Sequence, residues 1–453
     1  MTKRTDKIRL GAFLMATGHH VAAWRHPRAQ ADAGINVEHY VSIAQSAERA
    51  GFDMMFLADS QGGFVDRADP DSIGRVAQVA GFEPLTLLSA IAARTSHIGL
   101  VATATTTYYP PFLLARLFAS LDNVSAGRAG WNLVTSAAAS EAQNFGLKAH
   151  PEPEERYARA EEFARVVKGL WESWEDDAFP RDQASGVFAD ASRLHILNHE
   201  GEHFSVAGPL NVPRSRQGHP VVVQAGSSEP GRELGAATAE VIFTAHQSLD
   251  SAAAFYADIK ARMPRFGRRP DELKVMPGVM AVVGETEAHA HEKYEKLQEL
   301  VHPDIGRRFL AKLFEEPRLL DHDPDLPLPE WLVVDGRKSR PALLLDIARS
   351  DGLTARQLHL RVTGARGHWT IHGTAASIVD QLENWFDGYG ADGFNVMPAH
   401  LPEHLDDFIA HVIPELRRRG RFRTEYEGTT LRENLGLPFP THYARRQLAE
   451  AAE

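Results

Sequence analysis

Gly226, Ser227 and Ser228 form a short segment whose residue types could bind a phosphate group. The segment follows the apolar run Val221–Val223, which predicts a strand buried on both faces. A helix is predicted to begin directly afterwards, at Glu229, because Glu and Pro suit a first helical turn. Such a unit presents free N–H groups, two hydroxyls and the positive end of a helix dipole to an anion. On these residues alone, a plain helix cap at Ser228 explains the segment at least as well.

Polar side chains also follow the other predicted strands, at the points where these strands end. Asp59 is the only obvious carboxylate among them. A lone carboxylate among Thr, Asn and Ser is typical of a hydrogen-bonding partner for a polar heterocycle, and a general base stays an alternative. His20 is either a structural histidine or a proton carrier, and its place at a strand end favours the second role. The side chains at predicted strand ends are His20, Asp59, Thr103, Thr105, Asn132, Ser136, Ser227 and Ser228.

Two groups of histidines have spacings that could bind a metal ion. His19, His20 and His26 follow the first predicted strand, whereas His289 and His291 lie in a predicted helix, where we expect them on a solvated face. No predicted strand end combines a histidine pair with the carboxylates that a zinc or binuclear site needs. We therefore predict no metal site. The chain has no cysteine, which excludes disulfides, thiolate nucleophiles and cysteine-bound metals.

Eight buried strand patterns alternate with helix patterns along the chain, which predicts a parallel sheet with right-handed crossovers. Eight such units, with an apolar last strand able to close on the first, favour an α/β fold of the (β/α)8 TIM-barrel type. We predict one domain over 1–453, with irregular insertions after strand four, about Asp176–Gly218, and after strand seven, about Val301–Trp369. All strand ends would then meet at one mouth of the barrel. The predicted strands are Ile8–Met15, Phe52–Leu57, Ile98–Ala104, Arg128–Val134, Val221–Val223, Val241–Ala245, Lys274–Val283 and Gly393–Met397.

Composition narrows the possible partners of the chain. Of 453 residues, 43% are hydrophobic and 24% are charged, and the net charge is -11, so the chain is an ordinary globular protein with no long basic run for nucleic acid. No apolar segment is long enough to span a membrane, and the first ten residues lack the apolar core of a signal peptide. We expect a cytoplasmic protein. No Gly-x-Ser-x-Gly or Gly-x-Gly-x-x-Gly motif follows a strand, which argues against serine hydrolases and Rossmann enzymes.

Several long segments resemble the bacterial-luciferase-like flavin monooxygenases, and the likeness runs from about Ile8 to Leu437. It is strongest for the branch that contains nitrilotriacetate, dibenzothiophene-sulfone and long-chain alkane monooxygenases. The alkane enzyme's mouth cysteine and tyrosine are absent, which argues against an alkane substrate. The segments that carry the resemblance are Ala50–Ser60, Thr103–Tyr108, Ala115–Asp122, Gly127–Ser136, Asn144–Gly146, Glu155–Tyr157, Gln224–Ser228, Ala391–Asn395 and Phe422–Gly428.

The resemblance implies a barrel that holds reduced FMN (FMNH2), delivered by a separate NAD(P)H:flavin reductase. With O2, such an enzyme oxygenates a small sulfur- or nitrogen-containing organic substrate, under a lid formed by the second insertion. It also implies a homodimer or homotetramer. By motif match, His20 is the acid–base group, and the resemblance leaves open whether His19 or His20 faces the flavin. The implied flavin contacts are Asp59, Thr103, Thr105, Asn132, Ser136 and Ala137 at the ring and Tyr157, Gly226, Ser227 and Ser228 at the phosphate, and the implied substrate contacts are Phe64, Gln78 and Trp369.

Two alternatives on the same barrel stay open. One is an oxidoreductase that uses the deazaflavin F420, and the other is a protein that binds flavin without turnover. A metal-dependent hydrolase is a third alternative, which a metal assay showing no stoichiometric zinc or manganese would remove. Oxygen consumption with photoreduced FMN and substrate separates the monooxygenase from the F420 enzyme.

Overall fold

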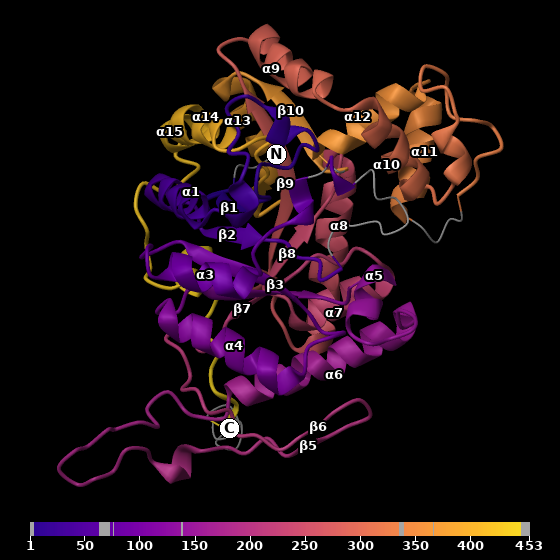
Figure 1. The fold of residues 1–453 in the computed structure, drawn as a ribbon. Coiled ribbons are helices and arrows are strands. Elements are labelled where there is room, and N and C mark those ends of the chain that lie inside the picture. Colours follow the sequence, from indigo (N-terminus) through magenta and orange to yellow (C-terminus); the bar gives the residue numbers. More distant parts are fainter. Residues whose placement is uncertain are drawn as a thin grey trace.

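In the computed structural model, eight parallel strands close into a barrel surrounded by helices (Figure 1). The structure describes residues 4–62, 73–75, 77–136, 139–334, 339–365 and 367–444. Around the barrel the strand order is β1-β2-β3-β4-β7-β8-β9-β11, and β11 pairs with β1 in parallel. The predicted (β/α)8 barrel is confirmed. Its strands are β1 (Arg9–Leu14), β2 (Met54–Leu57), β3 (Gly99–Thr105), β4 (Ala129–Val134), β7 (Val221–Gln224), β8 (Val241–Thr244), β9 (Lys274–Val283) and β11 (Gly393–Val396).

A cluster of apolar side chains fills the inside of the barrel. Phe13, Phe56 and Phe243 belong to the apolar cluster inside the barrel, and the ring centroid of Phe13 lies 4.6 Å from that of Phe56 and 4.9 Å from that of Phe243. The first residue of α16 (Leu431–Leu435) packs against Gly99 at the start of β3, where an added Cβ atom would collide with it. Burial of these side chains fixes the strands whose opposite ends form the mouth.

Helices cover the outside of the barrel, as the periodic patterns predict. Asn36 caps α1 (Val37–Ala50) by accepting a hydrogen bond from the His39 N–H at 3.1 Å, and Gly51 ends the helix with a φ of 87°. The other helices around the barrel are α3 (Pro84–Ala92), α4 (Pro111–Val124), α5 (Ala139–Asn144), α6 (Pro153–Trp171), α7 (Glu229–Thr238), α8 (Leu249–Arg262), α9 (Glu287–Glu299), α13 (Ala375–Asp387), α14 (Glu403–Asp407), a π-helical turn (Phe408–Val412) and α15 (Ile413–Arg418). Short 3-10 helices span Ala23–Arg25, Ala33–Ile35, Ala77–Val79, Ala191–Arg193, Met263–Phe266, Pro270–Glu272 and Pro317–Leu320.

The insertion after β4 extends away from the barrel (Figure 1). It contains the antiparallel pair β5 (His199–Glu200) and β6 (Ser205–Val206), and a 3-10 turn. The C-terminal segment lies beside it, because the rings of His195 and His442 are 4.9 Å apart between centroids. This insertion therefore lies away from the residues at the barrel mouth.

The insertion after β9 differs from the irregular segment that the sequence predicts. It contains three helices, α10 (Pro303–Leu313), α11 (Ser339–Ser350) and α12 (Ala355–Ala365), which form a separate lobe beside α9 (Figure 1). These helices bury their apolar side chains mainly against one another. The buried residues of this cluster include Leu310, Phe314, Leu319, Leu328, Leu332, Leu344, Leu345 and Leu358. The expectation of an irregular insertion is therefore wrong, because three helices occupy much of this segment and share one apolar cluster.

A ninth parallel strand, β10 (Trp369–Gly373), follows this lobe and pairs with the C-terminal half of β9, Val279–Val283. It lies outside the eight-stranded ring. Within the residues that the structure describes, no helix combines the length and the apolar character that crossing a bilayer requires.

Candidate active site

A cavity of about 360 Å³ opens at the carboxyl ends of β2, β4 and β7. The ends of neighbouring parallel strands meet there, as in other (β/α)8 barrels. The cavity is lined by Asp59, Ser60, Leu133, Val134, Thr135, Ser136, Glu141, Tyr157, Gln224, Ala225 and Gly226. Four of the residues predicted to contact a cofactor or lie at strand ends therefore line one cavity, namely Asp59, Ser136, Tyr157 and Gly226.

Thr103 and Asn132 are held together by a short chain of hydrogen bonds at the strand ends. Thr103 Oγ1 donates to the Leu57 carbonyl at 2.8 Å and accepts from Asn132 Nδ2 at 2.9 Å. Both side chains are buried. Within the described part of the chain, Asn132 Oδ1 has no hydrogen-bond partner. Because buried polar atoms are nearly always satisfied, this oxygen is suited to accept a hydrogen bond from a bound molecule.

Thr105 and Ser136 form a second pair at the same edge. Ser136 Oγ donates to Thr105 Oγ1 at 2.9 Å, which also accepts from the Thr107 N–H at 3.1 Å. Ser136 has a φ of 52°, in the left-handed region that a residue with a Cβ atom rarely adopts. The Arg156 guanidinium donates to the Ser136 carbonyl and to the Thr135 carbonyl, and so braces this strained turn.

Tyr157 and Ser228 meet at the amino-terminal end of α7. The two hydroxyl oxygens are 3.0 Å apart, and Ser228 Oγ accepts from the Gly231 N–H at 3.3 Å. Ser227 and Ser228 are exposed, and an added Cβ atom at Gly226 would lie 3.0 Å from the Gly231 Cα atom. The predicted strand–turn–helix unit is therefore present, with a tyrosine from α6 added to it. Its hydroxyls and helix dipole suit a phosphate.

Asp59 lies half-buried at the end of β2, and burial, opposed by a backbone hydrogen bond at Ser60, raises its pKa to about 6. Glu141 in α5 is a second carboxylate in this cavity, which the sequence analysis missed. It accepts from Ser60 Oγ at 2.9 Å and from the Gln61 N–H at 3.0 Å. Glu141 therefore holds the segment that follows Asp59.

His19 and His20 occupy different surroundings. His20 is fully buried, its Nδ1 accepts from the Ala22 N–H at 3.2 Å, and its Nε2 is 2.9 Å from Gln298 Oε1 in α9. Burial lowers the pKa of His20 to about 4, so the ring is neutral near pH 7. His19 packs against Phe13, with ring centroids 4.6 Å apart and its Nε2 2.9 Å from the Phe13 carbonyl oxygen. His19 therefore packs on the apolar cluster inside the barrel, and His20 on α9.

Trp369 and Gln78, two of the three predicted substrate contacts, do not line this cavity. Trp369 is 8% exposed and stacks on Trp385 of α13 at 4.2 Å between ring centroids. Gln78 is half-buried in the 3-10 helix Ala77–Val79 and does not line the cavity. Phe64 and Ala137 lie outside the described residues.

The sequence did not single out Glu141 or Arg156 as site residues. Glu141 gave no signal in the sequence, because its short helix is not adjacent to β2 along the chain. Arg156 was visible in the segment Glu155–Tyr157 but was not singled out.

These features fit a planar, polar ring with a phosphate group, such as the flavin that the resemblance implies. The unpartnered Asn132 oxygen and the Asp59 carboxyl offer acceptors to ring N–H groups, again counting only described residues. Tyr157, Ser227, Ser228 and the α7 amino terminus would hold the phosphate.

Comparison with known proteins agrees with this arrangement. Nitrilotriacetate monooxygenase component A from Aminobacter aminovorans is 51% identical over 440 residues, which cover 96% of this chain and 97% of that protein. N-acetyl-S-(2-succino)cysteine monooxygenase from Bacillus subtilis is 48% identical, with 98% of this chain and 100% of that protein covered. Among solved structures, EDTA monooxygenase from Chelativorans superposes with a TM-score of 0.82 at 34% identity, covering 96% of this chain and 100% of that one.

The family model described as luciferase-like monooxygenase matches residues 13–393, which include six of the eight barrel strands in full. The barrel, the strand-end side chains and the full-length relatives agree, so the chain belongs to the luciferase-like monooxygenase family and is a flavin-dependent monooxygenase.

Proposed function

We propose that the mouth binds reduced FMN, supplied by a separate NAD(P)H:flavin reductase, and that the protein uses O2 to oxygenate a small nitrogen- or sulfur-containing organic molecule. Reduced flavin supplies the electrons with which O2 is split, so that one oxygen atom enters the substrate and the other leaves as water. The chain's own residues bind the cofactor, exclude water and manage protons.

The Tyr157–Ser228 hydroxyl pair is the observation that carries the choice of FMN. The two hydroxyls lie 3.0 Å apart at the amino terminus of a ten-residue helix, where a terminal monophosphate would receive hydrogen bonds from both. Riboflavin lacks this group. A cofactor that ends in one phosphate therefore suits the site.

A separate reductase is supported by the sequence and by the relatives. No Gly-x-Gly-x-x-Gly motif for a nicotinamide cofactor follows a strand in this chain. The relative that is 51% identical is named as component A, which implies another component. The relatives' names refer to nitrogen- and sulfur-containing small molecules, and this supports the same substrate class here.

Proton handling is assigned to the histidine pair after β1. The sequence favours His20, but both of its ring nitrogens already have partners, and the Gln298 bond must break before it exchanges a proton. His19 Nε2 likewise lies 2.9 Å from the Phe13 carbonyl oxygen, but the His19 ring packs on Phe13 inside the barrel end, whereas His20 packs on α9. This geometry favours His19, and variants of the two residues separate the roles.

The test is a reconstituted assay with purified protein, a flavin reductase, NADH, FMN and a panel of aminocarboxylates, thioethers and sulfones. We expect substrate-dependent oxygen consumption and a product heavier by one oxygen atom in mass spectrometry, labelled from 18O2. Reduction of substrate by reduced F420 without oxygen uptake would contradict the proposal. Stoichiometric FMN binding without turnover on any substrate would favour the non-catalytic alternative.

A further inference from the structure

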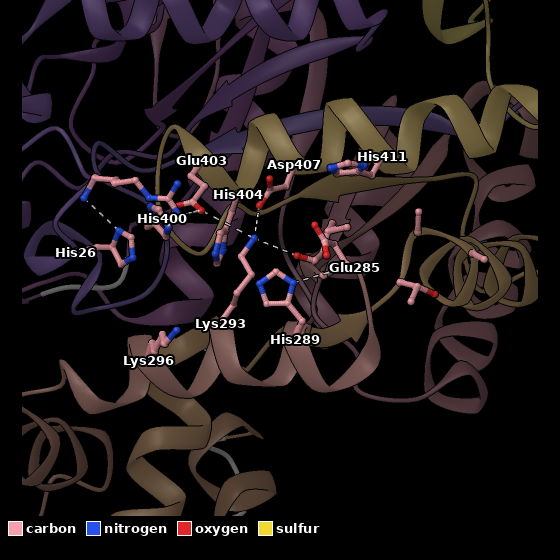
Figure 2. A pocket seen from close by; sticks show the side chains of 16 residues that line it. His26, Glu285, His289, Lys293, Lys296, His400, Glu403, His404, Asp407 and His411 are labelled. Carbon is pink, nitrogen blue, oxygen red and sulfur yellow. Dashed lines mark hydrogen bonds and ion pairs between the residues drawn. The ribbon is translucent and has the colours of Figure 1, made fainter.

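His26, His400 and Glu403 form a cluster in a second cavity, of about 580 Å³, that shares no lining residue with the mouth cavity. One ring nitrogen of each histidine and one carboxylate oxygen of Glu403 all lie within 4.8 Å of one another. Figure 2 shows the three side chains together at one end of the pocket, with Lys293 extending from α9 toward Glu403. We call this the histidine–glutamate cluster.

The chain brings these residues together from its two ends. His26 follows the 3-10 helix Ala23–Arg25 after β1, and His400 and Glu403 lie at the start of α14 after β11. The backbone fixes this approach, because the N–H groups of His19 and His20 donate to the carbonyls of residues 398 and 399 at 2.9 and 3.0 Å. The cluster therefore lies where the segments after β1 and β11, the first and last barrel strands, meet.

The two imidazole rings of the cluster are placed to bind a metal ion. His26 and His400 stack at 3.9 Å between ring centroids, and His400 Nε2 lies 3.1 Å from Glu403 Oε2. The His400 ring is 1% exposed, and its Nδ1 has no hydrogen-bond partner among the described residues. His26 Nδ1 accepts from the Arg28 N–H at 3.3 Å, which leaves Nε2 as the donor to a cation.

His404 adds a second observation that points to an ion. It is 2% exposed, its ring lies 4.3 Å from that of His400 between centroids, and its Nδ1 has no hydrogen-bond partner among the described residues. Unsatisfied buried nitrogens are rare in folded proteins, and a missing ion is one of the standard explanations. The unpartnered His404 nitrogen therefore lies beside the His400 ring as a further possible ligand.

Two cations already compete for Glu403. Arg28 forms an ion pair with it, and Lys293 Nζ lies 4.0 Å away, while Lys293 also pairs with Asp407. The Arg28 side chain is 69% exposed, so little free energy is lost when its ion pair with Glu403 breaks. Lys293 keeps Asp407 as its partner. Arg28 is therefore the side chain that a bound ion displaces.

We propose that the histidine–glutamate cluster binds one divalent transition-metal ion of the zinc class. Two imidazole nitrogens and one carboxylate oxygen are a donor set that Zn²⁺ accepts, whereas Mg²⁺ and Ca²⁺ prefer all-oxygen sites. Ligands about 2.1 Å from zinc lie about 3.4 Å from one another in a tetrahedron, so small side-chain rotations suffice. The fourth position is open to water or to His404. The bound ion joins the segments after β1 and β11.

A second group, Glu175, His195 and His442, is a weaker candidate. His442 Nε2 already lies 2.8 Å from the Glu172 carbonyl oxygen, and its Nδ1 accepts from the Ala444 N–H at 3.3 Å. Both of its nitrogens are therefore occupied. This second group therefore serves as the control for nonspecific zinc binding.

The test titrates the chelator-treated full-length protein with ZnCl2 against a chromogenic chelator, and records the visible spectrum with Co²⁺. We expect one equivalent of zinc, and an affinity lower by about tenfold or more in His26→Gln and in Glu403→Gln, because loss of even an outer-shell partner costs that much. Arg28→Gln should bind zinc more tightly, since it removes the competitor. Zinc should raise the Tm of the wild-type protein and not that of His26→Gln.

His411→Gln, which lines the same cavity outside the cluster, and His195→Gln, in the second group, are the matched controls and should bind zinc like the wild type. His26 is only half-buried, so its variant is expected to fold, and circular dichroism checks this. The proposal is overturned if no stoichiometric zinc binds, if His26→Gln and Glu403→Gln bind it unchanged, or if Arg28→Gln binds it more weakly.

Discussion

The hydroxyl groups of Tyr157 and Ser228 lie 3.0 Å apart, although the two residues are separated by 71 positions in the chain. Each hydroxyl satisfies the other in the absence of an anion, and both are placed to turn toward one. Ser228 serves the fold as well, because it caps α7. The helix cap and the proposed phosphate site therefore use the same residue and do not exclude each other.

Replacing both serines with alanine should weaken FMN binding by about 2–4 kcal/mol, since each lost hydrogen bond to a charged phosphate contributes about 1–2 kcal/mol. Fluorescence titration measures the change. Ser248→Ala is the matched control, because Ser248 caps α8 through a bond of the same 3.3 Å length and does not line the mouth cavity. Equal FMN affinity in the double variant and the wild type would rule out this phosphate site.

The histidine pair gives a second prediction. We expect His19→Ala to keep FMN affinity while product yield falls by about 10²–10⁴-fold and hydrogen peroxide rises, because a proton carrier is lost. His20→Ala should instead lower the Tm, since it leaves Gln298 Oε1 without its partner at 2.9 Å. Product, peroxide and thermal unfolding are measured on both variants. Uncoupling in His20→Ala together with normal coupling in His19→Ala would restore the role that the sequence assigns to His20.

The barrel could be predicted from sequence because each strand is a short buried run ended by polar residues or glycine. Val221–Val223 and Phe52–Leu57 are examples, and their ends locate Ser228 and Asp59. Once eight strands are parallel, their ends must converge, so most mouth residues follow from the strand pattern alone.

Other parts of the site depend on contacts that leave no local pattern. Glu141 reaches Ser60 from a short helix 81 residues away, and His26 meets His400 only because the last strand pairs with the first. The helices of the second insertion were missed since their apolar faces turn toward one another and not toward a strand. Long-range pairing of this kind is set by tertiary packing, not by spacing.

The pKa of Asp59 predicts a pH dependence of flavin binding. Burial raises this pKa from 3.8 to about 6, so the folded protein holds the Asp59 proton more tightly than the unfolded chain does. The stability of the folded protein therefore falls as the pH rises from about 3.8 to about 6. The ionised carboxylate is the stronger acceptor, so FMN affinity should rise from pH 5 to pH 7. In Asp59→Asn, the increase in FMN affinity that comes from the Asp59 carboxylate should be lost. Only the increase that comes from ionisation of the FMN phosphate, whose second pKa is about 6, should remain. Identical pH profiles for the two proteins, in fluorescence titrations, would contradict the assignment.

The second insertion gives the last prediction, which concerns a lid. Its helices pack on their own apolar cluster, and α12 is tied to the barrel through Gln298, whose Nε2 donates to the Leu360 carbonyl at 3.0 Å while its Oε1 contacts His20. A lobe with an apolar cluster of its own can move as a unit. We expect fast hydrogen exchange in Val301–Trp369 without flavin and protection when FMN or substrate is bound. Gln298→Ala should speed exchange in α12 and leave exchange in β4, inside the barrel wall, slow in both states. Uniformly slow exchange in the free protein would show that the insertion is static, and the mouth would then need another way to exclude water.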